Sequence, residues 1–235
     1  MSTVLLIRHG LTAMTGPVLA GRTPGIHLDD RGRAQAEALA QRVAALPVAA
    51  IVTSPLERCV ETADLLAAAQ KNAPEQHVDE RLIECGYGDW TGKPIKELAR
   101  DPLWKVVQGQ PSAVRFPNGE SLPEVAARAV QAIRDWDAKL GPDSVWVACS
   151  HGDVIKSVLA DALGLHLDQF QRIVVDPCSA SIVRYTDTRP YVLRANDVGG
   201  GGGDLAGFAP PKRRRRPSRT RSDATVGGGS GAGAV

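Results

Sequence analysis

Three apolar runs in the chain lead into side chains that could bind and transfer an anion. The run LLI is followed by Arg8 and His9, the run IVTSP leads to Arg58, and the run WVACS is followed by His151. Each histidine precedes a glycine, which would let the backbone turn sharply or let a ligand approach closely. Two guanidinium groups around one pocket favour phosphate oxygens, and a neutral imidazole can attack phosphorus. These four residues therefore predict a site that binds phosphate.

The segment before Arg58 adds a second signal for an anion. Ser54 and Pro55 are typical of a helix N-cap and of the first helical position. A helix that begins there would direct free N–H groups and the positive end of its dipole toward the ligand. This arrangement would add to the attraction of Arg58 for phosphate.

For these groups to meet, the apolar runs must be neighbouring strands of one sheet. Apolar runs alternate with segments of helical periodicity, which predicts an α/β fold. The expected architecture is a three-layer α/β/α arrangement with a mostly parallel sheet as its central layer. Ligands collect beyond the carboxyl ends of such strands, so the candidate residues would share one edge. A C-terminal β-hairpin over 179–196 is expected at one side of the sheet. The predicted strands are 3–7, 49–55 and 144–150, and the predicted helices are 30–46, 56–69, 120–140 and 153–164.

Composition divides the chain into a catalytic domain and a tail. Of 235 residues 43% are hydrophobic, which suits one domain over residues 1–198. Residues 199–235 are dominated by glycine, proline, serine and arginine and are predicted to be disordered. The net charge of +2 is uneven, because the tail has seven Lys/Arg and two Asp while the rest has 21 Lys/Arg and 24 Asp/Glu. The basic run from Lys212 to Arg216 leaves a weak polyanion contact open, although nucleic-acid binding is not favoured.

The sequence gives no signal for a membrane segment or a resident metal. No apolar run reaches the roughly 18 residues of a membrane helix, and Arg8 interrupts the first apolar stretch, which argues against a signal peptide. A cytoplasmic location is therefore expected. Neither a metal nor another cofactor is predicted, because the cysteines lack zinc-ligand spacing. The four cysteines, expected to be buried and reduced, are Cys59, Cys85, Cys149 and Cys178.

Six segments, in order along the chain, resemble motifs of the histidine phosphatase superfamily, in the branch of the phosphoglycerate mutases and many phosphatases (branch 1). They are LLIRHGLT, HLDDRGRAQAEAL, TSPLERCVETA, LIECGYGDWTG, FPNGESLPEV and SHGDVIK, and they cover most of residues 1–196. The resemblance implies a reaction through a phosphohistidine, which requires no metal.

The resemblance also implies roles for the candidate residues. His9 would be the nucleophile, Arg8, Arg58 and His151 would hold the phosphoryl oxygens, and Glu84 takes the position of the proton donor. The chemistry agrees, because cations stabilise the charge of the transition state and a carboxylic acid can protonate the leaving oxygen. One carboxylic acid in the donor role predicts a mildly acidic optimum.

Further positions follow the family motifs or depart from them. Thr12 matches a hydroxyl that contacts phosphate, and Thr15, which replaces a common amide, is a candidate phosphate ligand. Arg22 is expected to reach the non-phosphate part of a substrate. Asp29 replaces a common threonine and is expected to cap the next helix. Asp153 is interpreted as a charge at a helix N-terminus.

Residues 85–120 are expected to form a lid that selects the leaving group. In this segment Trp90, Trp104 and Phe116 are interpreted as the core of the lid. The mutases of the family have an extra basic segment after the glutamate motif, whereas residues 90–116 contain five separate cations and no paired arginines. Hydrolysis of a small phosphorylated molecule is therefore favoured over a phosphoglycerate mutase-type reaction.

Three hypotheses from other classes remain beside this one. A metal-dependent phosphoesterase could use His9 and His151, but its usual ligand spacings are missing. A polyanion binder would depend on the basic tail. A non-catalytic relative is disfavoured because all five expected active-site residues are present. A homodimer also stays open, since an exposed helix could support one.

Overall fold

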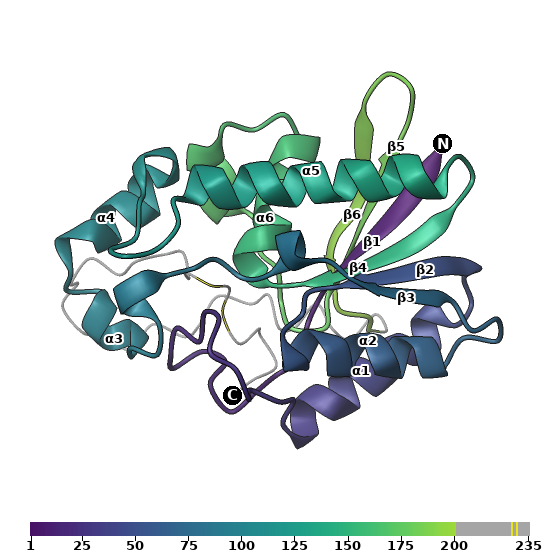
Figure 1. Cartoon of the computed structure of the whole chain (residues 1–235), viewed down its shortest axis with the longest axis horizontal. Helices are drawn as coiled ribbons and strands as arrows, with labels where there is room; N and C mark the ends of the chain where they lie inside the picture. Colours follow the sequence, from purple (N-terminus) through teal and green to yellow (C-terminus); the bar gives the residue numbers. More distant parts are fainter. Residues whose placement is uncertain (201–226, 228, 230–235) are drawn as a thin grey trace.

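A six-stranded sheet runs through the middle of the molecule (Figure 1). This computed structural model describes residues 1–200, 227 and 229. The strands are β1 (Ser2–Arg8), β2 (Val48–Thr53), β3 (Glu75–Val78), β4 (Val145–Ser150), β5 (Ala180–Tyr185) and β6 (Pro190–Asp197). Their order is β3-β2-β4-β1-β5-β6, in which β1 to β4 are parallel and β5 and β6 form an antiparallel hairpin.

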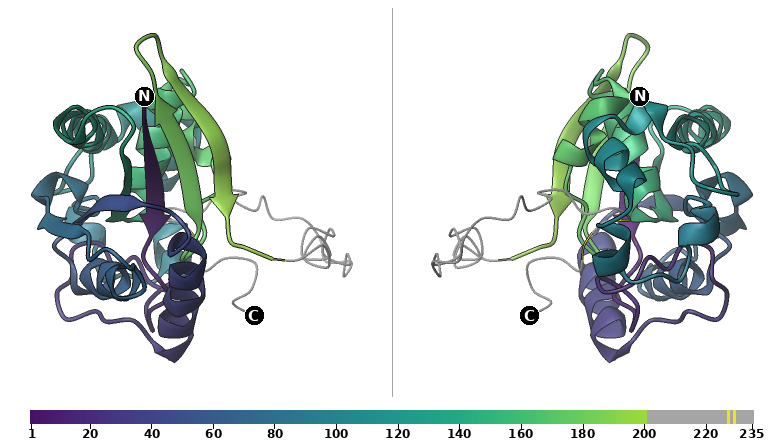
Figure 2. Two further views of the ribbon diagram at one scale, coloured as in Figure 1. Left: turned by 90° about the vertical axis from the view of Figure 1, so that its right-hand side faces the viewer. Right: turned by 90° about the vertical axis from the view of Figure 1, so that its left-hand side faces the viewer.

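Helices cover both faces of this sheet (Figures 1 and 2). The α-helices are α1 (Asp30–Val43), α2 (Glu57–Ala68), α3 (Ile95–Leu98), α4 (Pro102–Gly109), α5 (Leu122–Leu140) and α6 (Gly152–Ala162). Short 3-10 helices are η1 (Glu80–Leu82), η2 (Gly88–Trp90), η3 (Pro111–Ala113) and η4 (Leu167–Arg172). The pair α1 and α2 packs on one face, and α5 and α6 pack on the other.

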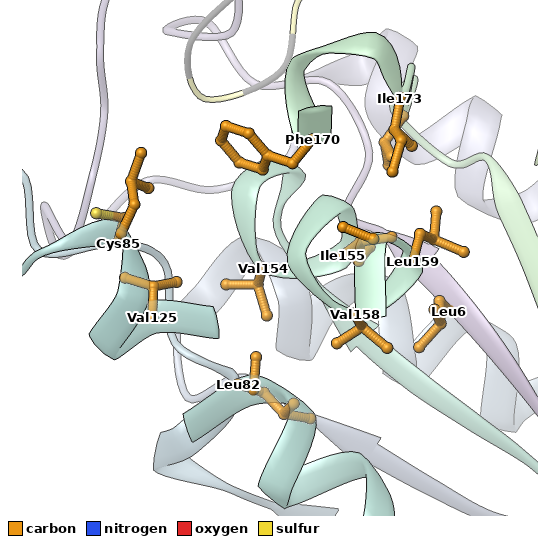
Figure 3. Close-up of a cluster of buried hydrophobic side chains, with 14 of the residues drawn as sticks. Leu6, Leu82, Cys85, Val125, Val154, Ile155, Val158, Leu159, Phe170 and Ile173 are labelled. Atoms are coloured by element: carbon orange, nitrogen blue, oxygen red, sulfur yellow. The ribbon is translucent and has the colours of Figure 1, made fainter. Parts of the chain in front are cut away.

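The alternation of side chains along β1 builds the two core layers. Leu5 and Ile7 pack toward α1 and α2, whereas Leu6 faces the other side, where it lies near Val158 and Leu159 of α6 (Figure 3). Successive strand residues point to opposite faces, so a strand buried on both sides must be apolar throughout. Each such side chain contributes about 1.5–3 kcal/mol of burial free energy. This burial fixes the strand that ends at the candidate site.

The predicted three-layer fold with a mostly parallel sheet and a C-terminal hairpin is confirmed. The differences are local. Strand β3 was not predicted, because EQHV at the edge of the sheet has no apolar pattern. Helix α1 ends at Val43 rather than at residue 46. Nearly all of the tail over 199–235, predicted to be disordered, lies outside the described residues.

The predicted burial of the cysteines and of the aromatic residues Trp90, Trp104 and Phe116 is confirmed. All four cysteines are free and buried. Trp90 stacks against Trp104 and meets Phe116 edge to face, and these three rings belong to the same core cluster as α5 and α6. None of the helices built from described residues is both long and apolar enough to cross a bilayer.

The start of α1 and the loop after β1 approach each other so closely that both need glycine. Asp29 caps α1 by accepting a hydrogen bond from Gly32 N at 2.8 Å, as predicted. A Cβ on Gly32 would lie 2.0 Å from the Leu11 carbonyl oxygen, and a Cβ on Gly10 would lie 2.5 Å from the Gly32 carbonyl oxygen. Gly10 therefore makes room for helix α1, which is a different role from the sharp turn or ligand approach expected from the sequence.

This packing predicts a large effect for Gly32→Ala. The added methyl group meets backbone atoms that cannot rotate away, so we expect a loss of about 2–3 kcal/mol of unfolding free energy. Gly109→Ala is the matched control, because a Cβ there meets nothing within 4 Å. Denaturant unfolding of the two variants checks the prediction. Equal stability of Gly32→Ala and Gly109→Ala would contradict it.

Candidate active site

The register of the sheet brings the predicted residues together. Arg8 at the end of β1 pairs with Ser150 at the end of β4, so the residues that follow, His9 and His151, become neighbours. Their ring centroids are 5.2 Å apart. Thr53 of β2 pairs with Cys149, which places the start of α2 and Arg58 beside them. The residues that line the pocket are Arg8, His9, Thr12, Thr15, Gly16, Val18, Leu19, Ala20, Gly21, Arg58, Glu84, Tyr87, Ile95 and Gly227.

His9 is held as a neutral imidazole with one nitrogen directed toward the pocket. Its Nδ1 lies 2.7 Å from the Gly10 carbonyl oxygen, which can only accept, so the proton is on Nδ1 and the lone pair is on Nε2. Burial, together with the charges of Arg58 and Arg8, keeps the pKa of His9 well below its usual value. Nε2 is therefore unprotonated at neutral pH, as a nucleophilic nitrogen must be.

Two buried guanidinium groups lie beside this nitrogen. Arg58 Nε donates to His9 Nε2 at 3.3 Å, and Arg58 Nη2 donates to the Gly21 carbonyl oxygen at 2.7 Å. Arg58 Nη1 is buried without a hydrogen-bond partner among the described residues. Arg8 is also buried, and its Nη1 donates to the Val175 carbonyl oxygen at 2.8 Å. A buried guanidinium with an unused N–H in a pocket is suited to an anion.

His151 lies behind these groups and does not line the pocket. Its Nε2 is 2.7 Å from Ser54 Oγ, and its Nδ1 is 3.3 Å from Arg58 Nη2. In this arrangement the ring supports Arg58 and packs against His9. Its predicted contact with phosphoryl oxygens stays a prediction.

The predicted N-cap role of Ser54 is wrong. Helix α2 begins at Glu57, its N-cap is Leu56, and no side chain caps it. The Ser54 hydroxyl is 2.7 Å from His151 Nε2, and its oxygen also accepts from the Leu56 N–H at 3.4 Å, one residue before the helix begins. The tertiary contact with a buried imidazole prevails here over the local capping preference of serine.

Glu84 lines the pocket from the irregular chain between η1 and η2, and only 4% of it is exposed. The pKa of Glu84 is raised to about 7, first by burial and then by the charge of Asp153, which together outweigh the opposing effects of the Cys85 N–H, Arg58 and Arg8. A carboxylic acid that keeps its proton to near neutrality is suited to donate it.

Asp153 has a larger role in the site than the sequence indicated. It lies in the first turn of α6, as expected, but it is fully buried and accepts a hydrogen bond from Tyr87 Oη at 2.8 Å. Lys156 Nζ is 4.0 Å from its carboxylate. Sequence reasoning missed Tyr87 and the burial of Asp153. The position of Asp153 three residues after the end of β4 was a signal that could have indicated it.

The remaining candidates divide into two groups. Thr12 and Thr15 both line the pocket, and their hydroxyl oxygens are 2.9 Å apart. Arg22 does not line it: its guanidinium donates to Glu120 Oε2 at 2.6 Å and to the Glu84 carbonyl oxygen at 2.8 Å. Contact of Arg22 with a substrate therefore stays a prediction.

Two glycines near the end of the chain also contact the site. The Gly229 carbonyl oxygen lies 2.6 Å from Arg8 Nη1, and the Gly227 carbonyl oxygen lies 3.4 Å from Arg8 Nη2. Gly227 N donates to the Asp153 carboxylate at 3.2 Å. Carbonyl oxygens on the Arg8 guanidinium occupy donor positions that a phosphate would use.

This contact predicts the effect of shortening the tail. A chain ending at Val198 is expected to keep the kcat of the full chain. Its Michaelis constant and its inhibition constant for inorganic phosphate should both be lower by about threefold or more, because a segment that competes for the site reduces the apparent affinity. A chain ending at Thr225 loses the two glycines but keeps the basic run, and it should behave in the same way. The prediction would be contradicted if only the chain ending at Val198 showed the lower constants, or if either shortened chain lost turnover.

The geometry agrees with comparisons to known proteins. A family model described as histidine phosphatase superfamily (branch 1) matches residues 4–198. The chain belongs to this family. Its relatives include proteins named as phosphatases and as probable phosphoglycerate mutases.

Similar proteins carry names from both reaction types. The chain is 29% identical to phosphoserine phosphatase 1 of Hydrogenobacter thermophilus, over 83% of this chain and 92% of that one. It is 32% identical to a probable phosphoglycerate mutase of Cronobacter sakazakii, over 79% and 86%. A solved structure, YhfR of Bacillus stearothermophilus, has a TM-score of 0.76 at 27% identity, covering 85% of this chain and 98% of that one. A phosphoserine phosphatase of Entamoeba histolytica has a TM-score of 0.75 at 25% identity, over 84% and 98%.

Proposed function

We propose that this histidine phosphatase hydrolyses a small phosphomonoester through a phosphohistidine on His9, without a metal. The observation that carries the proposal is the environment of His9 Nε2. This nitrogen is unprotonated because Nδ1 is bound to the Gly10 carbonyl, and the same pocket holds two buried arginines and the buried acid Glu84. A nucleophile, a cationic cage and a proton donor in one pocket are the parts that phosphoryl transfer needs.

In the first step His9 Nε2 attacks phosphorus and the bond from phosphorus to the leaving oxygen breaks. Arg8 and Arg58 bind the phosphoryl oxygens, and the unused Nη1 of Arg58 gains a partner. Glu84 donates its proton to the leaving oxygen, so the product departs as an alcohol. The Nδ1–H of His9 stays on the Gly10 carbonyl throughout.

In the second step water attacks the phosphohistidine. The Glu84 carboxylate, left ionised by the first step, takes a proton from this water as the new P–O bond forms and the P–N bond breaks. Inorganic phosphate leaves, His9 returns to its neutral form and Glu84 is again protonated. The cycle therefore consumes one phosphomonoester and one water.

Hydrolysis is favoured over mutase chemistry by the charges around the pocket. A phosphoglycerate mutase must hold the carboxylate of its substrate. Among the described residues that line the pocket, Arg8 and Arg58 are the only arginines or lysines, and both serve the phosphoryl group. The five cations of residues 90–116 are exposed and do not line it: Lys93, Lys96, Arg100, Lys105 and Arg115.

Direct capture of the intermediate tests the proposal. Rapid quenching with a phosphorus-labelled phosphomonoester is expected to trap acid-labile label on the protein, and turnover should persist in EDTA. Phosphate release is then screened across sugar phosphates, glycerate phosphates, nucleotides and phosphoamino acids, with mutase turnover assayed in parallel. Failure to trap label, sensitivity to the chelator, or mutase turnover faster than hydrolysis would each contradict the proposal.

Other properties proposed for this protein go with the catalytic function. Its partner is a small phosphorylated substrate, and a mildly acidic optimum follows from Glu84 as the acid. The cytoplasmic location, the homodimer and the weak polyanion contact stay predictions. The lid role of residues 85–120 also stays a prediction, although Tyr87 and Ile95 of this segment line the pocket.

A further inference from the structure

The main chain around Glu84 has no regular secondary structure to hold it. Glu84 lies between η1 (Glu80–Leu82) and η2 (Gly88–Trp90), so strand or helix hydrogen bonds do not fix its position. The apolar residues on either side are anchored, since Leu82 and Cys85 belong to the cluster with Val125 and Val154 (Figure 3). Apolar packing is not directional and does not by itself fix where a carboxyl group points.

Three charged side chains from separate segments supply directional contacts to this stretch. They are Arg22 from the loop after β1, Glu120 just before α5, and Arg128 in α5, and we name them the Glu84 clamp. Glu120 Oε2 accepts from Arg22 Nη2 at 2.6 Å and from Arg128 Nη2 at 3.0 Å, and Oε1 accepts from Arg128 Nε at 3.0 Å. The carboxylate thus joins the two arginines.

The two arginines of the clamp also donate hydrogen bonds to backbone carbonyls at and before Glu84. Arg128 Nη1 donates to the carbonyl oxygens of Arg81 and Ile83, each at 2.7 Å. The Glu84 carbonyl oxygen accepts from Arg22 Nε at 2.8 Å and from Arg128 Nη2 at 3.1 Å.

Glu120 binds the backbone of Gly86, on the C-terminal side of Glu84. Its Oε2 accepts from Gly86 N at 2.8 Å, and its own N–H donates to the Gly86 carbonyl oxygen at 2.8 Å. The backbone is therefore held by charge-assisted bonds before, at and after the residue that carries the acid.

The clamp is partly buried, and its carboxylate stays ionised. Arg128 has 17% of its side chain exposed and Glu120 has 22%, so these bonds are shielded from water. Burial alone would raise the pKa of Glu120, but the hydrogen bonds from Arg128 and from Gly86 N outweigh it and hold the pKa below its usual value. The Glu120 carboxylate therefore stays ionised over the pH range in which Glu84 changes protonation.

We propose that Arg22, Glu120 and Arg128 are positioning residues that hold the Glu84 carboxyl at the leaving oxygen. The inference rests on the proposed role of Glu84 as proton donor. Proton transfer needs the two heavy atoms within about 2.6–3.2 Å, and a displacement of about 1 Å costs on the order of 100-fold in rate. A network that binds backbone carbonyls before, at and after Glu84 is suited to that tolerance.

The experiment compares substrates that differ in their need for an acid. A nitrophenyl phosphate has a leaving group that departs without protonation, whereas an alkyl phosphate such as glycerol phosphate does not. The measured quantity is kcat/KM, which covers steps up to formation of the phosphoenzyme and so excludes its hydrolysis. Glu120→Gln and Arg128→Lys are expected to lower kcat/KM by about tenfold or more for the alkyl phosphate and by less than about threefold for the nitrophenyl phosphate.

Control variants make the outcome decisive. Arg134→Lys alters another arginine of α5 that pairs with a carboxylate, Asp161, and should leave both substrates unchanged. In Glu84→Gln, which lacks the acid, a further Arg128→Lys change should have no added effect on the alkyl phosphate. Thermal unfolding confirms that each variant is folded.

The possible failures are distinguishable. An equal loss on both substrates in the clamp variants, or no loss on either, would overturn the positioning role while leaving the proposed function in place. If Glu84→Gln itself failed to discriminate between the two substrates, Glu84 would not be the acid, and the proposed function would fail together with the clamp.

Discussion

Replacing His9 with alanine is expected to reduce kcat for every phosphomonoester by about 10⁴-fold or more, because the variant has no nucleophile and must rely on direct attack by water. The imidazole lines the pocket, and the hydrogen bond from Nδ1 to the Gly10 carbonyl leaves Nε2 unprotonated. The variant should also bind no acid-labile phosphate in a rapid-quench experiment. Substrate binding should persist, because Arg8 and Arg58 are unchanged.

The control for this variant is His27→Ala. His27 is exposed and pairs with Glu61 on the surface, so its loss should leave turnover unchanged. Steady-state kinetics and phosphate labelling of both variants check the prediction. A His9→Ala protein that retains more than about one-hundredth of the activity would show that another group or a water molecule is the nucleophile.

Replacing Glu84 with glutamine is expected to have the next largest effect, and the effect should depend on the substrate. For an alkyl phosphate, kcat/KM should fall by about 10²–10⁴-fold, the usual contribution of a general acid. For a nitrophenyl phosphate, whose leaving group needs no proton, the fall should be far smaller. Equal losses on both substrates would contradict the role of Glu84 as acid.

The pH dependence gives the same variant a second test. Only protonated Glu84 can donate, and its pKa of about 7 means that the donor form is lost as pH rises through neutrality. In the wild type, kcat/KM for an alkyl phosphate should therefore decline above about pH 7, and Glu84→Gln should lack this decline. The pKa of His9 is well below its usual value, so protonation of the nucleophile limits activity only in more acidic solution. The substrate phosphate titrates near pH 6, and this effect is common to both proteins.

The sequence was sufficient for the fold class and for the arginines, the histidine, the glutamate and the threonines that line the pocket. The reason is that strand ends are a local feature: apolar runs that are buried on both faces can be recognised, and the polar residues that follow them must lie at one edge of a parallel sheet. His9, Arg8 and Arg58 follow from this rule, and the glutamate motif added Glu84. The edge strand β3 was missed because it buries little surface and has no apolar pattern.

The tertiary structure alone decided what each side chain contacts. Ser54 could cap a helix or bind an imidazole, and Arg22 could meet a substrate or Glu120; sequence preferences cannot choose, because the competing partner is distant along the chain. Sequence preferences also could not predict the elevated pKa of Glu84, which depends on burial and on the charge of Asp153 in helix α6. Strand ends are set by short-range patterns of apolar residues, whereas protonation and positioning depend on charges that only folding brings within a few ångströms.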